Sequence, residues 1–187
     1  KFGKLLDQLG LKVPEWGVAD GFEEARAIAD RVGYPVLVRP SFVLGGRGMR
    51  ICGSEEGLRH AMEGSAPGTL VDQFLQNAVE LDVDILCDGQ DAWIAGILEH
   101  VEPAGVHSGD SACVIPGPSI TPAIEAKVHE LATALTRGLD ARGLFNLQLA
   151  LKDGELWVIE ANPRASRTVP FIAKATGIPI IDLACRL

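Results

Sequence analysis

This 187-residue chain lacks several features that define whole classes of protein. Its 4 cysteines form no C-x-x-C pair, which argues against a zinc site or a disulfide framework and indicates reduced thiols of a cytosolic protein. No apolar run approaches the ~20 residues that a membrane helix needs, and no signal peptide is visible. The formal net charge is -8 and no basic stripe is present, so we expect neither nucleic acid nor an anionic membrane as a partner.

The composition and the chain ends indicate an α+β protein of two small lobes. Hydrophobic residues make up 47% and charged residues 22%, which is ordinary for a globular chain of this length. The chain starts at Lys1 inside a predicted helix and stops at Leu187 inside a second periodic segment, so we interpret it as a piece of something longer. We expect a helix left from a preceding region at 1–12, a small lobe at 13–75 and a large lobe at 76–187.

The small lobe is predicted to alternate short strands with two helices. Asp20 and Ser54 each precede an apolar pattern of helical period and are therefore expected to cap helices. A glycine-rich loop from Leu44 to Met49 follows the apolar strand around Val38. The predicted elements are strands at 34–40, 50–52 and 69–75 and helices at 20–33 and 54–63.

The large lobe is predicted to contain an antiparallel sheet. From Glu80 to Cys87, acidic and apolar residues alternate, which is typical of a half-buried strand. The segment 103–120 is rich in Gly and Pro, and irregular loops of that length are usually functional or disordered. Thr121 is expected to open a helix with one buried stripe. The other predicted elements are strands at 92–101, 144–151 and 156–161 and a helix from 170 to 177.

The last two predicted strands form a hairpin, and its register decides which side chains share a face. A two-residue loop would set Glu160 opposite Leu147 on an apolar face. A three-residue loop pairs Lys152 with Leu156 and sets Gln148 opposite Glu160. Because a one-residue slip moves every side chain to the other face, we predict the three-residue loop. The further expected pairs are Leu147 with Ala161, Leu149 with Ile159 and Leu151 with Trp157.

This register gathers three oxygen-bearing side chains on one sheet face. Gln148 lies opposite Glu160, and Asn162 follows two residues on. One carboxylate and two amide oxygens suit Mg²⁺, which takes few protein ligands and leaves the rest to water and phosphates. The alternative is that the two amides only line a solvated face.

Cationic side chains lie beside the hairpin and beside the glycine-rich loop. Arg39 ends an apolar strand next to Gly45 and Gly46, where backbone N–H groups can approach a phosphate without obstruction. Arg164 and Arg167 follow the hairpin and suit a phosphate or carboxylate group in transfer. The alternatives are a mobile hairpin tip, a strand-end arginine at the surface and a solvated basic loop.

Taken together, these segments resemble the ATP-grasp domain of the large subunit of carbamoyl-phosphate synthetase. The resemblance covers nearly the whole chain, and it is the combination of motifs in this order that is specific. It implies an ATP-grasp fold, with a small α+β lid lobe, a larger lobe with an antiparallel sheet, and nucleotide bound between them. The matching segments are Val38 to Met49, Ala104 to Cys113, Gly143 to Gln148 and Ile159 to Phe171.

Details of the motifs are similar to the carboxyl-terminal half of that subunit, which phosphorylates carbamate. The amino-terminal half, which phosphorylates bicarbonate, differs at the corresponding positions. The distinguishing residues are Val43 to Arg47, Glu99 to Glu102, Ser108, and Ala112 with Cys113.

The resemblance also implies roles for individual residues. Arg39 and Arg164 would be the catalytic arginines, the first on an ATP phosphate and the second on the transferred group. Glu80 would hold the ribose hydroxyls. Two Mg²⁺ or Mn²⁺ ions would be held by Gln148, Glu160 and Asn162. The remaining nucleotide contacts would be Gly45, Gly46, Asp72, Gln73, Leu75, Gly105, Val106, His107 and Ser108, with Gln148 and Glu160 shared with the metals.

The implied cofactors are ATP and these two divalent ions, with K⁺ as a further candidate. The implied partners are the remainder of the large subunit and a glutaminase small subunit, and the small-molecule substrates are carbamate and ATP. The implied setting is the cytoplasm and the biosynthesis of pyrimidines and arginine. We expect this piece alone to be weak or inactive in the overall synthesis.

Two other interpretations stay open. In the first interpretation the chain is also part of an enzyme, either the bicarbonate-phosphorylating half or another ATP-grasp ligase. In the second it is a nucleotide-binding module without catalysis, although the intact set of candidate ligands argues against decay of the site.

Overall fold

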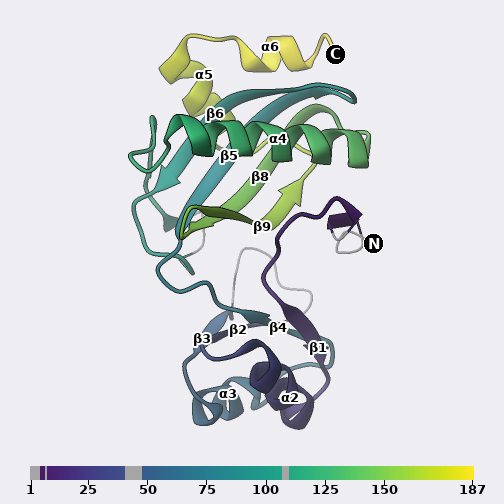
Figure 1. The fold of residues 1–187 in the computed structure, drawn as a ribbon, viewed down its shortest axis with the longest axis vertical. Coiled ribbons are helices and arrows are strands. Elements are labelled where there is room, and N and C mark those ends of the chain that lie inside the picture. Colours follow the sequence, from purple (N-terminus) through teal and green to yellow (C-terminus); the bar gives the residue numbers. More distant parts are fainter. Residues whose placement is uncertain (1–4, 7, 41–47, 107–109) are drawn as a thin grey trace. The chain divides into compact units, whose positions relative to one another are not determined.

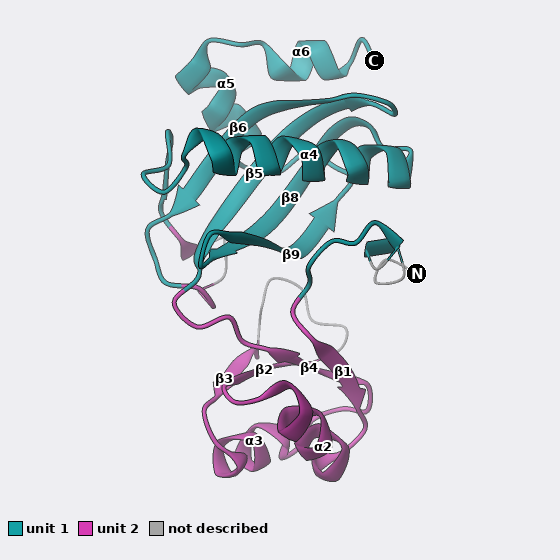
Figure 2. Ribbon diagram, in the orientation of Figure 1, with its two compact units in different colours: residues 1–13, 78–103, 112–187 teal, residues 14–77, 104–111 magenta. Residues whose placement is uncertain are grey.

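The computed structural model of this chain describes all residues except 1–4, 7, 41–47 and 107–109 (Figure 1). The chain divides into two compact units (Figure 2). Unit 1 comprises residues 1–13, 78–103 and 112–187, and unit 2 comprises 14–77 and 104–111. No described helix is both long and apolar enough to cross a bilayer. The cysteines are free thiols, as their scattered spacing predicts.

Unit 2 is a sheet of four strands in the order β1-β4-β2-β3, with two helices packed on it (Figure 1). Its core joins valines of β2 and β4 to alanines of the first helix and to Leu58 of the second. The elements are β1 (Trp16–Ala19), α2 (Phe22–Val32), β2 (Val36–Arg39), β3 (Arg50–Cys52), α3 (Glu55–Met62) and β4 (Thr69–Gln73).

The two helix caps predicted in this unit have different outcomes. Ser54 caps α3 as predicted, because its hydroxyl accepts a hydrogen bond from the backbone N–H of Gly57 at 3.2 Å. The prediction for Asp20 is wrong, since the cap position of α2 is Gly21. The Asp20 carboxylate instead accepts from the backbone N–H of Gly68 at 2.7 Å and ties the helix to the loop before β4.

Unit 1 is a sheet of five antiparallel strands in the order β7-β6-β5-β8-β9. The short strand β7 lies inside the segment that we predicted to be irregular throughout. The strands are β5 (Val79–Asp88), β6 (Ala92–His100), β7 (Cys113–Val114), β8 (Arg142–Lys152) and β9 (Glu155–Asn162). The helices are α4 (Pro122–Leu139), α5 (Val169–Thr176) and α6 (Ile180–Ala184).

The two faces of the unit 1 sheet differ in chemistry. One face is covered by α4 (Figure 1). Leu81, Val83 and Ile85 belong to the same buried cluster as Val128 and Leu135 of α4. Thr121 caps α4 as predicted, accepting from the backbone N–H of Ile124 at 3.3 Å. Alternation along the strands therefore leaves the acidic and amide side chains of β5, β8 and β9 on the opposite face.

The hairpin of β8 and β9 pairs Gln148 with Glu160 as predicted, but its turn differs from the predicted one. The predicted three-residue loop is wrong, because Lys152 pairs with Glu155 and only Asp153 and Gly154 form the turn. The pairs predicted for Leu149 and Leu151 are also wrong, since these residues lie opposite Val158 and Leu156.

A β-bulge at Ile159 then corrects the register. One extra residue on β9 restores the predicted pairs of Leu147 with Ala161 and of Gln148 with Glu160. The bulge leaves Ile159 41% exposed, next to Glu160, which is also exposed. The bulge therefore allows a two-residue turn and the pairing of Gln148 with Glu160 in the same hairpin, which a regular ladder would not.

The turn gives a test of this hairpin. Asp153 and Gly154 have φ values of 51° and 75°, the left-handed conformation expected of a two-residue loop. A Cβ added at Gly154 would meet nothing within 4 Å, so the cost of Gly154→Ala is one of backbone conformation alone. We expect Gly154→Ala to lower the free energy of unfolding by about 1–2 kcal/mol in urea denaturation. Gly53→Ala is the matched control, since that site is equally open but lies outside the left-handed region. An unchanged stability for Gly154→Ala would contradict the turn.

Candidate functional site

The predicted metal ligands come together on the polar face of unit 1. Gln148 and Glu160 are directly paired across β8 and β9, and Asn162 pairs with Asn146 two residues further along. On the other side of β8, Asp82 of β5 lies opposite Gln148. The face therefore presents a row of oxygen atoms across three adjacent strands.

The state of two of these side chains fits a metal with a phosphate. Glu160 is exposed, and its carboxylate makes no hydrogen bond or ion pair with any residue that the structure describes. The side-chain nitrogen of Asn162 is buried and finds no acceptor among the described residues. A buried unsatisfied donor calls for an explanation. A phosphate oxygen bound beside the metal would supply the missing acceptor, while Glu160 offers an open anionic ligand.

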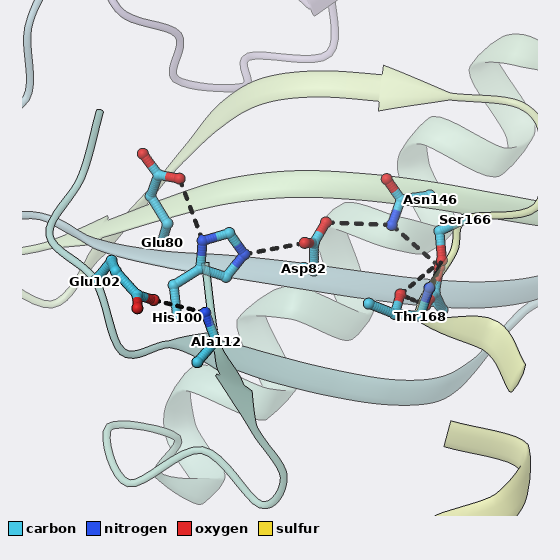
Figure 3. A network of polar contacts seen from close by, with 9 residues as sticks. Glu80, Asp82, His100, Glu102, Ala112, Asn146, Ser166 and Thr168 are labelled. Carbon is cyan, nitrogen blue, oxygen red and sulfur yellow. Dashed lines mark hydrogen bonds and ion pairs between the residues drawn. The ribbon is translucent and has the colours of Figure 1, made fainter. Parts of the chain in front are cut away.

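A second polar group on this face joins Glu80, a predicted site residue, to His100 and Asp82, which were not predicted (Figure 3). His100, at the end of β6, lies between two carboxylates of β5. Its Nδ1 is 3.5 Å from Glu80 Oε2, and its Nε2 is 3.0 Å from Asp82 Oδ2. Hydrogen bonding to Asp82 and then to Glu80 raises the pKa of His100 to about 9, so the imidazolium is the stable form at neutral pH.

The same residues raise the alternative of a second metal centre. One ligand atom each of Asp82, His100 and Cys113 lies within 4.8 Å of the others. A metal would need a neutral imidazole and a thiolate. However, the two carboxylates hold the proton on His100, and burial raises the pKa of the Cys113 thiol. Both ring nitrogens of His100 already face a carboxylate, so the geometry is that of an ion-paired imidazolium in contact with Glu80.

Asp84 organises a third part of the face and was also missed. This carboxylate is buried and accepts hydrogen bonds from the hydroxyls of Ser166 and Thr168 and from the side chain of Asn146. Burial raises the pKa of Asp84 against the lowering effect of these donors. The loop that carries Arg164 is thereby tied to the middle of β5. The period-two pattern of β5 places Asp84 on the polar face, but its partners Asn146, Ser166 and Thr168 lie 62, 82 and 84 residues away in the chain.

The predicted site residues of unit 2 form a separate group. Arg39 makes a bidentate ion pair with Asp72, with its Nε and Nη2 at 2.6 and 2.7 Å from the two carboxylate oxygens. Neighbouring Gln73 donates its backbone N–H to the carbonyl of Glu15 at 2.7 Å, and Leu75 is buried. The Arg39 guanidinium is thus held in one orientation by a nearly buried carboxylate, which the strand-end position did not predict.

The rest of the predicted nucleotide contacts are only partly described. Gly105 lies beside the side chains of Ile51 and Phe74, and Val106 is half-buried. The remaining four predicted contacts lie outside the described residues: Gly45, Gly46, His107 and Ser108.

With this geometry in view, comparison with known proteins identifies the family. The family described as "Carbamoyl-phosphate synthase L chain, ATP binding domain" matches residues 1–187. The chain belongs to this family. It is 50% identical over 192 residues to the carbamoyl phosphate synthase large chain of Thermotoga maritima, covering 100% of this chain and 18% of that protein. The large chain of Halobacterium salinarum is 51% identical over 192 residues, again covering 100% of this chain and 18% of that protein.

Solved structures show the same fold at lower identity. The biotin carboxylase domain of Hydrogenobacter thermophilus 2-oxoglutarate carboxylase, in complex with MgADP, ADP and bicarbonate, superposes with a TM-score of 0.77 at 21% identity, covering 98% of this chain and 43% of that one. N5-carboxyaminoimidazole ribonucleotide synthetase from Thermus thermophilus superposes with a TM-score of 0.73 at 21% identity, covering 87% and 44%. The family domain therefore has the ATP-grasp fold, as the sequence predicted.

The His100 ion pairs predict how stability changes with pH. The pKa of His100 is about 9 in the folded chain against an ordinary 6.5, so the folded state binds this proton more tightly. The resulting stabilisation is fully present below pH 6.5 and is lost as pH rises through 9. We expect the difference in free energy of unfolding between the native sequence and His100→Gln to shrink over this range in urea denaturation.

The control is His129→Gln, which removes an imidazole from an exposed position of α4 and should change the free energy of unfolding by less than about 0.5 kcal/mol. A titration of His100 near its ordinary value, followed by NMR of the ring nitrogens, would contradict the ion-paired assignment.

Proposed function

We propose that this chain is the ATP-binding part of a carbamoyl phosphate synthase large chain and that its site phosphorylates carbamate with MgATP. The observation that carries the proposal is the pairing of Gln148 with Glu160, with Asn162 beside them, in a chain of this family. The chain spans 18% of the large chains it matches in Thermotoga and Halobacterium, so the whole activity belongs to the longer protein.

Gln148, Glu160 and Asn162 would hold the divalent ions. The bound ions would supply neutralisation of the phosphate charge that develops during transfer. Glu160 contributes the anionic ligand, and the two amides contribute neutral oxygens. The set would attract a divalent cation, and with one such ion bound its net charge would be positive and would attract a polyphosphate. Mg²⁺ fits this hard oxygen set, and Mn²⁺ accepts the same ligands.

The protein's own part in the reaction is binding and orientation. A carbamate oxygen attacks the γ-phosphorus of ATP in line, the bond to the β–γ bridging oxygen breaks, and carbamoyl phosphate and ADP leave. Arg164 would stabilise the charge on the transferred group, and Arg39, fixed by Asp72, would hold an ATP phosphate. Glu80, oriented by His100, would accept hydrogen bonds from the ribose hydroxyls.

The remaining nucleotide contacts are proposed on the family pattern. Gln73 and Leu75 would contact the adenine, Gln73 through its backbone. Gly45, Gly46, Gly105, Val106, His107 and Ser108 would line the phosphates and the nucleoside. K⁺ is a further candidate ion. The longer protein would work in the cytoplasm with a glutaminase partner that supplies ammonia, for pyrimidine and arginine synthesis.

Carbamate is preferred to bicarbonate as the acceptor because of motif details. Val43 to Arg47, Glu99 to Glu102, Ser108, and Ala112 with Cys113 are similar to the half that acts on carbamate. The second candidate is the bicarbonate-phosphorylating half, which would use the same ligands and the same in-line displacement. A non-catalytic nucleotide-binding module is disfavoured, since the candidate ligands and both arginines are present.

A single substitution separates these candidates. In a full-length large chain carrying this sequence, we expect Glu160→Gln to lower ATP formation from carbamoyl phosphate and ADP by at least about 10²-fold, because the anionic metal ligand is lost. Bicarbonate-dependent ATP hydrolysis, measured on the same preparation, should be retained. The opposite pattern would assign this site to bicarbonate, and no change in either reaction would remove Glu160 from the metal site.

The control lies on the same strand. Glu155 is an exposed carboxylate at the start of β9 that pairs with Lys12 and Lys127. Glu155→Gln removes one charge from the same strand, and it should leave both partial reactions within about twofold. Calorimetry with MgATP on the full-length protein then tests the module reading, since binding without either partial reaction would favour it.

A further inference from the structure

Asp84 is in an unusual position for a carboxylate. It lies in the middle of β5 with 1% of its surface exposed. Its partners in the described residues are all neutral: Asn146 at 3.0 Å, Ser166 at 2.9 Å and the hydroxyl of Thr168. No described cation pairs with it. Because a buried carboxylate without a counter-ion is costly, stability alone does not explain this residue.

The two hydroxyls that donate to Asp84 lie directly before α5. Thr168 is the cap residue of α5, yet its side chain makes no capping hydrogen bond and donates to Asp84 instead. The Ser166 hydroxyl accepts from the backbone N–H of Thr168 at 3.1 Å and at the same time donates to Asp84. Asp84 thus fixes both the end of the loop and the first turn of α5.

A glycine on the neighbouring strand β6 leaves room for α5 to lie close to Asp84. Gly96 of β6 lies directly opposite Asp84. A Cβ added at Gly96 would lie 3.0 Å from the Ile172 side chain of α5, which is closer than an ordinary contact. The missing side chain therefore lets α5 approach the sheet, and this brings Thr168 within reach of β5.

The loop held in this way carries the proposed catalytic arginine. Residues 163–168 join β9 to α5, so one end of the loop follows Asn162 and the other end is tied to Asp84. At the first end, the backbone N–H of Arg164 donates to the carbonyl of Asn162 at 2.7 Å. The side chain of Arg164 itself is exposed and reaches only the carbonyl of Ala165 within the described residues.

We propose that Asp84 is a positioning residue that holds the 163–168 loop through Ser166 and Thr168 and so fixes Arg164 against the transferred phosphoryl group. This inference rests on the proposed function for the role of Arg164. The contribution is to orientation, because a misplaced catalytic group costs rate without weakening the nucleotide contacts made elsewhere.

The test uses a full-length large chain and measures ATP formation from carbamoyl phosphate and ADP. Thr168→Val removes one donor to Asp84 and should lower kcat by about 10- to 100-fold while KM for ADP stays within about twofold. Thr168→Ser keeps the hydroxyl and should restore kcat to within about threefold of the native value. Asp84→Asn, the second variant, should lower kcat in the same way.

The matched control is at the other end of the same helix. The hydroxyl of Thr176 donates to the carbonyl of Ile172 and has no contact with the loop. Thr176→Val should keep kcat within about twofold of the native value. A structural readout independent of activity is the exchange protection of the Thr168 amide, which should fall in Thr168→Val and in Asp84→Asn.

The possible results distinguish failure of the positioning role of Asp84 from failure of the proposed function. If Arg164→Ala lowers kcat but Thr168→Val and Asp84→Asn do not, the positioning role is wrong and the proposed function stands. If Arg164→Ala leaves the reaction unchanged, the proposed role of the arginine fails. Equal losses in Thr168→Val and Thr168→Ser, or a rise in KM for ADP that matches the fall in kcat, would overturn the positioning role.

Discussion

The candidate metal-ligand set of unit 1 depends on the β-bulge at Ile159. A two-residue turn in a regular ladder would place Glu160 on the side that α4 covers, where its charge would be buried among leucines. The extra residue moves Glu160 back into register with Gln148, and Asn162 follows. A single inserted residue therefore keeps the apolar side chains of β9 in the core and places Glu160 on the polar face.

Beside these candidate ligands, the buried carboxylates of Asp82 and Asp84 organise the polar face through hydrogen bonds. Asn146 donates to both Asp82 and Asp84, at 3.4 and 3.0 Å, and so joins the carboxylate that meets His100 to the one that ties down the 163–168 loop. Removing any member would leave a desolvated partner without its hydrogen bond, which costs more than the bond itself contributes. The exposed Glu160 thus shares its sheet face with a network of buried, hydrogen-bonded side chains, while its own carboxylate contacts no described residue.

Local chemistry explains which parts were predictable from the sequence. Alternation in β5, the caps Ser54 and Thr121 and the pairing of Gln148 with Glu160 follow from period and side-chain type. The bulge could not be predicted from local sequence because its stability depends on the packing of the whole hairpin. The predicted three-residue loop is wrong, although it placed Glu160 on the correct sheet face. The contacts of His100, Asp84 and Arg39 were missed because each joins residues 18 or more positions apart that only the folded sheets bring together.

The metal assignment is tested most directly by a structure of the full-length large chain with ADP and Mg²⁺. We expect a metal ion at about 2.0–2.1 Å from a carboxylate oxygen of Glu160, with an amide oxygen of Gln148 or Asn162 also in its coordination shell. We also expect the Asn162 side-chain nitrogen to donate to a phosphate oxygen. A metal coordinated by Asp82 and His100 instead, with Glu160 facing only solvent, would contradict the assignment.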